Sequence, residues 1–295
     1  MYLATSSPKA RPGRGTTLVL ACLLGATAPC RLVLAADAPV FEQVFRADFR
    51  GQPFNVKALQ LVGTHTADLV KPSPDGLRIT IPRGLGKPGP IGVVPKFRVR
   101  GDFDISGTFE VLKVDRPTEG NGIGIQLLVE ADKPTKDAAT VAWVYQAGDK
   151  GMTFTTMTIT GPPAARKYRR LESVPARAWA GTLRLVRHGA IVTTSYRDGP
   201  TAPERVLREI EIGSEDLAQV RFAVHTGWTD LPADARLTGL TIAADGLPGY
   251  DGTPLVPPGR SPWLLIGGAM ALGVIGMGLA AAGMAKRRRR LGAAR

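Results

Sequence analysis

The sequence predicts an all-β fold, an antiparallel β-sandwich of the jelly-roll or concanavalin A-like type, with an N-terminal signal peptide and one C-terminal transmembrane helix. Three observations lead to this prediction. About twelve short segments rich in β-branched and aromatic residues are separated by glycine, proline and aspartate. No helical pattern alternates with them, which argues against a parallel sheet. Each end of the chain carries an apolar run beside basic residues, which indicates export and membrane attachment.

The first segment is expected to be a signal peptide. Three basic residues precede an apolar run from Leu18 to Ala28, and Val33 and Ala35 then supply the small residues that a signal peptidase recognises. Cleavage after residue 35 or 36 would remove residues 1–36, and both cysteines of the chain lie within them. The exported body is therefore expected to fold without disulfides.

The body, residues 37–245, is expected to form one β-sandwich domain. Its segments alternate apolar and polar residues at the two-residue period of a half-buried strand. Residues 214–219 are the one expected helical turn, with Ser214 as its N-cap. In chain order, the expected strands lie at residues 40–45, 76–82, 97–114, 122–130, 139–146 and 152–160, in a hairpin over 181–199 that turns at His188-Gly189, and at 219–228 and 235–246.

The segment 97–114 contains Arg100-Gly101-Asp102, a tripeptide that some adhesive proteins display on a loop. Alternation places the apolar residues and the glycines on one face, and Arg100 and Asp102 on the other. An adhesive loop would require Gly101 to interrupt the strand. We therefore interpret the two charges as part of the polar surface of a sheet.

Four phrases in the first half of the body carry a resemblance to a known family. The body resembles a family of domains of unknown function found in exported proteins of planctomycete bacteria, and its second half is similar to laminin-G and concanavalin A-like sandwiches. The resemblance implies a jelly roll outside the cytoplasm and supplies no catalytic residues. The phrases lie at residues 47–55, 75–82, 101–112 and 120–129.

The chain after the body is expected to be a linker, a membrane helix and a short tail. Proline and glycine fill nine of the seventeen positions in 246–262, which predicts an extended linker. Residues Trp263–Ala285 follow without a charge, and a helix of that length spans about 34 Å. Lys286 and four arginines come next, so the positive-inside rule predicts a cytoplasmic tail at 286–295 and a single-pass protein of the cell membrane with its body outside the cytoplasm.

The formal net charge of +13 is concentrated at the two ends of the chain. The leader and the tail carry basic residues and no acid, so the body is nearly balanced. Membrane addressing explains this distribution, and we expect no nucleic-acid partner. One basic cluster remains in the body, at residues 166–170. We interpret it as a solvated loop or edge strand, with acidic glycans or lipid head groups as the alternative contacts.

No catalytic constellation stands out in the sequence. Glycan hydrolases of the sandwich class need two carboxylates on one strand face, and the nearest pair, Asp102 and Asp104, contains no glutamate. The three histidines lie on different segments without acidic or cysteine neighbours at ligand spacing. We expect no catalytic residues, cofactor or metal. Calcium is the alternative that laminin-G-like domains suggest, but the loop acids Asp198, Asp230 and Asp234 match no cation-loop spacing.

Aromatic residues are the candidate ligand-binding groups, because the apolar face of a sugar stacks on an aromatic ring. The candidates are Trp143, Tyr145, Trp179 and Trp228, and a core role is the competing interpretation for each. The sequence thus favours a non-catalytic module that binds a polysaccharide or another envelope protein. The alternatives are a glycan hydrolase or lyase with an unrecognised site, and a purely structural envelope protein.

Overall fold

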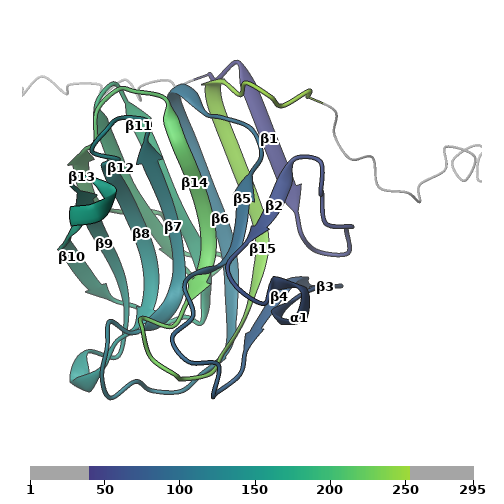
Figure 1. Ribbon diagram of the computed structural model, residues 1–295, viewed down its shortest axis with the longest axis vertical. Coiled ribbons are helices and arrows are strands. Elements are labelled where there is room, and N and C mark those ends of the chain that lie inside the picture. The colour runs from purple at the N-terminus through teal and green to yellow at the C-terminus, as the bar shows by residue number, and fades with distance from the viewer. Residues whose placement is uncertain (1–39, 253–295) are drawn as a thin grey trace, which may run out of the picture. The chain divides into compact units, whose positions relative to one another are not determined.

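The computed structural model describes residues 40–252, which form two antiparallel sheets packed face to face (Figure 1). The first sheet consists of β1 (Gln43–Asp48), β3 (Val70–Ser73), β4 (Gly76–Ile81), β6 (Arg100–Val114), β11 (Ala180–His188), β12 (Ile191–Asp198), β13 (Arg205–Glu211) and β15 (Ala233–Gly246). The second consists of β2 (Leu59–Val62), β5 (Ile91–Pro95), β7 (Ile123–Ala131), β8 (Ala138–Tyr145), β9 (Met152–Thr160), β10 (Lys167–Pro175) and β14 (Leu217–His225). The expected antiparallel sandwich is confirmed.

The sheets bring together strands that are far apart in the chain. In the first, the order is β13-β12-β11-β6-β15-β4-β3, with β1 also paired to β15. In the second, it is β10-β9-β8-β7-β14-β5-β2. The long central strand β6 therefore lies between β11 and β15, and β14 lies between β7 and β5. This topology decides which side chains share the outer face of each sheet.

The hydrophobic core fills the space between the two sheets. Strand β6 contributes Phe103, Ile105 and Phe109 to it, while β8 contributes Val141 and Trp143, all of them buried. Alternate residues on each strand point the other way, as a pleated strand requires. The outer face of each sheet is thereby left to a separate set of side chains.

The tripeptide at residues 100–102 belongs to the sheet, as the alternation predicts. Gly101 has φ of +66° at an irregularity in the β6–β15 register, and a Cβ there would lie 2.3 Å from Oδ2 of Asp245. The Asp102 N–H donates to that same carboxylate at 2.7 Å, and Oδ1 of Asp102 accepts from the Gly189 N–H at 2.8 Å. These contacts hold the tripeptide within the fold.

The helical turn expected at residues 214–219 is wrong. Strand β14 already begins at Leu217, whose buried side chain joins the core and whose N–H donates to the Val99 carbonyl at 2.9 Å. Strand pairing here outweighs the local capping signal of Ser214. The short helices lie elsewhere, at α1 (Thr66–Leu69), η1 (Gly148–Lys150) and η2 (Pro163–Ala165).

Contacts continue for a few residues beyond β15. The Tyr250 ring packs against Phe45 and Phe97 with centroid distances of 5.4 and 5.3 Å, and its N–H donates to the Leu247 carbonyl. The segments expected to be the signal peptide, most of the linker, the transmembrane helix and the basic tail lie outside the described residues. Within residues 40–252, no helix is long and apolar enough to cross a membrane.

Candidate functional site

A groove of about 680 Å³ lies on the outer face of the second sheet. Its floor comes from β7, where Gln126, Leu128 and Glu130 face the groove while the residues between them face the core. The same alternation makes β8, β9 and β14 contribute to it, and β10 closes one side. Residues 88–90 and Trp228 complete the rim.

The strand registers arrange the lining residues in rows across the sheet. One row runs from Arg221 on β14 through Leu128, Thr140 and Met157 to Arg170 on β10. Small and apolar residues therefore form much of the floor, and long cationic side chains rise from both sides. Five strands at about 4.8 Å spacing make the row roughly 19 Å long, measured along the sheet. The site is therefore long enough across the sheet for a chain-like ligand.

One charged pair crosses the groove. Nη2 of Arg166 lies 2.7 Å from Oε2 of Glu130, and both side chains are largely buried, with exposed fractions of 18% and 20%. The same guanidinium also donates to the Lys136 carbonyl. Glu130 is the single carboxylate among the described residues that line the groove, and this pair holds it in place.

His225 faces the groove from the end of β14 and is half-buried. Burial, together with the nearby charges of Arg221 and Arg170, lowers its pKa to about 4 from the ordinary 6.5. Its imidazole is therefore neutral at pH 7 and offers both a hydrogen-bond donor and an acceptor to a ligand.

The pKa of His225 leads to a prediction on stability. In the unfolded chain this residue takes up a proton below about pH 6.5, but in the folded protein only below about pH 4, so the unfolded state binds more protons between these values. The free energy of unfolding should fall by about 1–3 kcal/mol between pH 7 and pH 4 from this group alone. Urea titrations at several pH values should show a smaller loss in His225→Gln. An equal loss in both proteins would contradict the assignment.

Trp228 is held at the rim by a tight turn. Gly227 and Trp228 have φ of +58° and +68°, and the Thr229 N–H donates to the Thr226 carbonyl at 3.1 Å, which together are typical of a type I′ turn. A Cβ on Gly227 would lie 2.0 Å from the Gly122 carbonyl oxygen, so only glycine fits there. A bulky residue in the left-handed region is strained, and such strain is found at ligand sites. The indole is 64% exposed.

The other three aromatic candidates form a cluster away from the groove. Trp143 has no exposed surface, donates from Nε1 to the Ala178 carbonyl at 3.0 Å and packs against Trp179 at 5.6 Å. It therefore cannot present a ring face to a sugar. Tyr145 is half-buried against the edge of Trp179, which is itself 42% exposed. Of the four candidates, Trp228 alone lines the groove.

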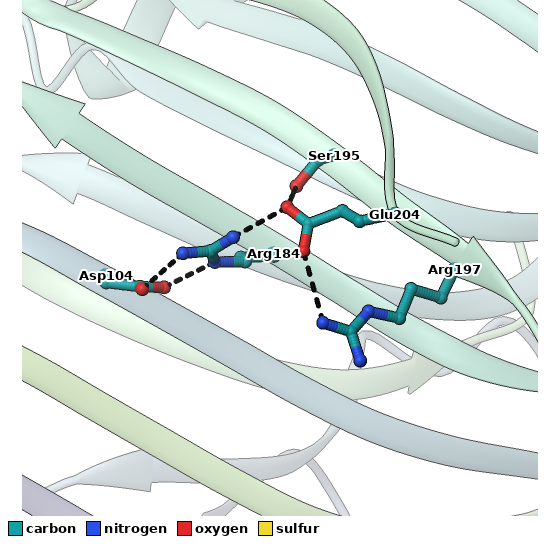
Figure 2. A network of polar contacts seen from close by, with 5 residues as sticks. All are labelled: Asp104, Arg184, Ser195, Arg197 and Glu204. Carbon is teal, nitrogen blue, oxygen red and sulfur yellow. Dashed lines mark hydrogen bonds and ion pairs between the residues drawn. The ribbon is translucent and has the colours of Figure 1, made fainter. Parts of the chain in front are cut away.

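The acidic pair considered for catalysis lies on the other sheet. Asp104 accepts hydrogen bonds from Nε and Nη2 of Arg184 at 2.7 and 2.5 Å, and Glu204 accepts from Nη1 of the same arginine at 2.7 Å (Figure 2). The Ser195 hydroxyl also donates to Glu204, at 2.7 Å. Hydrogen bonding to Asp104 raises the pKa of Arg184. Burial alone would raise the pKa of Glu204, but the bonds from Ser195 and Arg184 outweigh it and lower that pKa. The network therefore links the neighbouring strands β6, β11 and β12 of the first sheet.

The three acids considered for calcium bind protein donors, and two of them, Asp198 in β12 and Asp234 in β15, lie in strands and not in loops as expected. Asp198 accepts from the backbone of Arg177 and Ala178, while Asp230 accepts from two glycine N–H groups. Asp234 forms an ion pair with Arg78. Between residues 40 and 252, no group of three or more histidines, cysteines or acids could hold a metal ion.

Sequence reasoning missed most of the groove. Arg221 and His225 alternate with buried Phe222 and Val224 on β14, so the strand pattern marked them as outward but gave no sign of a shared site. For the basic cluster at 166–170 the sequence predicts an edge strand or a loop, and residues 167–170 belong to β10, at the edge of the second sheet. The sequence does not show that β14 pairs with β7, and this pairing places Arg221 and His225 beside the other lining residues.

Comparisons with known proteins agree with this fold. The family model described as "Protein of unknown function (DUF1583) C domain" matches residues 26–256. No curated protein matches the chain. LamAcat from Zobellia galactanivorans is similar in structure with a TM-score of 0.50 at 9% identity, over 69% of this chain and 98% of that one. At this identity the likeness shows the fold alone.

Two further solved structures are similar over comparable lengths of this chain. The GH43 protein BlXynB from Bacillus licheniformis has a TM-score of 0.49 at 13% identity, over 68% of this chain and 39% of that one. A legume lectin-like domain from Entamoeba histolytica has a TM-score of 0.44 at 14% identity, over 68% and 97%. The chain thus spans about two fifths of the length of BlXynB.

Proposed function

Because the chain belongs to the DUF1583 C-domain family, whose description assigns no activity, we propose a function from the groove itself. The protein is a polysaccharide-binding module without catalysis. The observation that carries this proposal is Trp228, a largely exposed tryptophan whose backbone is fixed in a left-handed conformation by a tight turn at the rim of the groove. The turn fixes the backbone position of this side chain at the rim, so less conformational entropy is lost when its ring stacks on a sugar.

The groove gives no support to a glycan hydrolase. Hydrolysis by the usual mechanisms needs two carboxyl groups about 5 to 10 Å apart on either side of the bond that is cut. Glu130 is the one carboxylate that the described residues place there, and it is paired with Arg166. A second carboxylate on the other side of a bound sugar is therefore missing among the described lining residues.

A lyase is the second candidate, and one observation favours it. His225 is neutral at pH 7 and lies beside arginines, so it could accept a proton from the carbon next to a sugar carboxylate. Elimination would break the bond between the glycosidic oxygen and the carbon one further along the ring. The oxygen would leave with a proton taken from water, and a carbon–carbon double bond would remain in the new end. The ultraviolet absorbance of that unsaturated sugar distinguishes this reaction from binding alone.

The cellular setting is also a proposal. The uncharged run at 263–285 and the basic residues after it would anchor the module in the cell membrane, with the sandwich outside the cytoplasm. The leader at 1–36 would direct its export. The family would then be the exported planctomycete family that the sequence resembles, and the module would hold a polysaccharide or another envelope component near the membrane.

Replacing Trp228 with glycine tests the proposal. We expect the full chain, purified in detergent, to bind at least one polysaccharide on a broad array, and the Trp228→Gly variant to bind it about tenfold more weakly, as for a central aromatic contact. Glycine accepts the left-handed conformation, so the free energy of unfolding should change by less than about 1 kcal/mol.

The matched control is Trp179→Ala, which removes a second exposed indole away from the groove. It should lower stability, since Trp179 packs on Trp143 and Tyr145, and leave the affinity unchanged. If no polysaccharide binds, or if the Trp179 variant alone loses affinity, the groove is not the binding site and a structural role gains weight.

A further inference from the structure

The groove retains positive charge that the protein does not neutralise. Arg166, Arg170 and Arg221 line it together with one carboxylate, Glu130, and the ion pair between Arg166 and Glu130 cancels two of these charges. Arg170 donates from Nη1 to the amide oxygen of Gln146 at 2.7 Å, which is a neutral partner. Two guanidinium groups thus remain without an ion pair among the described residues.

Arg221 is the more unusual of the two. It is half-buried, and burial lowers its pKa, because its charge is partly removed from water. Its Nε is buried without a hydrogen-bond partner in the described part of the chain. Its Nη2 reaches the amide oxygen of Gln126 only at 3.5 Å, the limit of a hydrogen bond. The cost of burying this cation is therefore not balanced by contacts within the protein.

Two other arginines also have a buried Nε without a partner, but their Nη atoms make strong contacts that Arg221 does not have. Arg187 donates from its Nη atoms to two backbone carbonyls. Arg236 lies within 3.3 Å of two carboxylates. Both are fixed by strong contacts that explain their position. Arg221 has no such contact, although it lies on the wall of the groove.

The neighbours of Arg221 complete an anion-binding environment. Arg170 lies in the same cross-strand row as Arg221, on the opposite side of the groove. The positive charges of both arginines lower the pKa of His225. Burial and these charges keep His225 neutral at pH 7, so it adds hydrogen-bonding groups but no further charge. Exposed rings, Tyr168 and Trp228, lie at diagonal corners of the same groove, where sugar rings could stack.

We propose that the groove selects an acidic polysaccharide and binds its carboxylate or sulfate group between Arg221 and Arg170. This inference rests on the proposed function, because it names the class of polysaccharide that the same site takes. The planar guanidinium matches the two oxygens of such a group, and a bond of this kind is stronger in a partly water-excluded groove than on an open surface. The rings give the selectivity for a sugar chain over a free anion.

The experiment measures binding of the full chain in detergent to three polysaccharides in parallel: polygalacturonate, which is carboxylated, carrageenan, which is sulfated, and laminarin, which is neutral. The variants are Arg221→Gln, which removes the charge, and Arg221→Lys, which keeps it without the planar fork. Arg50→Gln is the matched control, because Arg50 is exposed and contacts its neighbour Asp48 outside the groove. Vesicles containing anionic lipid form a fourth arm.

The expected result is preferential binding of an acidic polysaccharide, at least tenfold over laminarin and weaker at high salt. Arg221→Gln should lose roughly tenfold to a hundredfold in affinity for the acidic polymer, and Arg221→Lys should lose less. Arg50→Gln should behave like the unaltered protein. Whether polygalacturonate or carrageenan binds more tightly then identifies the anionic group.

Three results would overturn the inference. Equal binding of laminarin and the acidic polymers would leave the proposed function intact but remove the acidic selectivity. An acidic preference that survives Arg221→Gln would show a general charge effect. Binding of anionic vesicles that displaces the acidic polymer would show the same. Failure to bind any polysaccharide would remove both proposals.

Discussion

An Arg187→Ala variant is expected to lose about 3–5 kcal/mol of its free energy of unfolding. Arg187 occupies a core-facing position of β11 and has no exposed surface. Its guanidinium lies 4.8 Å from the centre of the Phe103 ring and donates to the carbonyls of Gly101 and Glu215. Alanine would leave a cavity and remove the donor of two partly buried hydrogen bonds, and each effect is destabilising.

Chemical denaturation followed by tryptophan fluorescence measures this loss. Arg187→Met serves as a partial replacement, because it fills the volume without donating hydrogen bonds, and its loss should be smaller. Arg50→Ala removes an exposed arginine and should change stability by less than about 1 kcal/mol. A loss for Arg187→Ala no greater than that of the Arg50 variant would show that the buried guanidinium does not hold this end of the core.

A Trp143→Ala variant is expected to lose about 3–5 kcal/mol of the free energy of unfolding while retaining its ligand affinity below the unfolding transition. The indole fills the space between the sheets, contacts Phe109 at 6.4 Å and Trp179 at 5.6 Å, and bonds the Ala178 carbonyl. Its strand neighbours Ala142 and Val144, which do line the groove, are unchanged.

Denaturant titration and polysaccharide binding on the same sample separate the two effects. Trp143→Phe keeps most of the buried ring and should be destabilised less than the alanine variant. The pair Trp143→Ala and Trp228→Gly should therefore show opposite behaviour, with stability lost in the first and affinity lost in the second. A folded Trp143→Ala protein that no longer binds would contradict the inter-sheet position of this indole.

The sandwich could be predicted because the two-residue alternation of a half-buried strand is visible within the sequence of single strands. In β6, apolar and polar residues alternate from Phe103 to Val111, and the structure buries the apolar set. Strand β11 keeps the same period with Leu183 and Leu185 buried, although Arg187 and not Val186 takes the next core-facing position. The prediction of a helical turn at 214–219 is wrong because local capping residues carry no information about which strand this segment pairs with. Leu217 pairs with Val99, more than a hundred residues earlier in the chain, and that contact decides its conformation.

The candidate site was harder to predict, and β8 shows why. Seven of its eight residues are buried, because one face meets the core and the other forms the groove floor. Alternation therefore could not assign Trp143 to either side. Trp228 could be recognised as a turn residue only through the positive φ angles that the fold imposes on it and on Gly227. Arg170 and Arg221 share one cross-strand row because four strand pairings join their strands, and no local pattern records these pairings.

The pairing of β1 with β15 has a mechanical consequence. Gln43 lies opposite Ala244, so the chain enters β1 and leaves β15 at the same end of their antiparallel ladder. Tension between residues 40 and 252 would load the hydrogen bonds of this ladder one after another, as in a zipper, instead of all together. The sandwich would therefore begin to open under pulling at β1, on the sheet opposite the groove, and the groove itself would be disturbed only after β1 had left the first sheet.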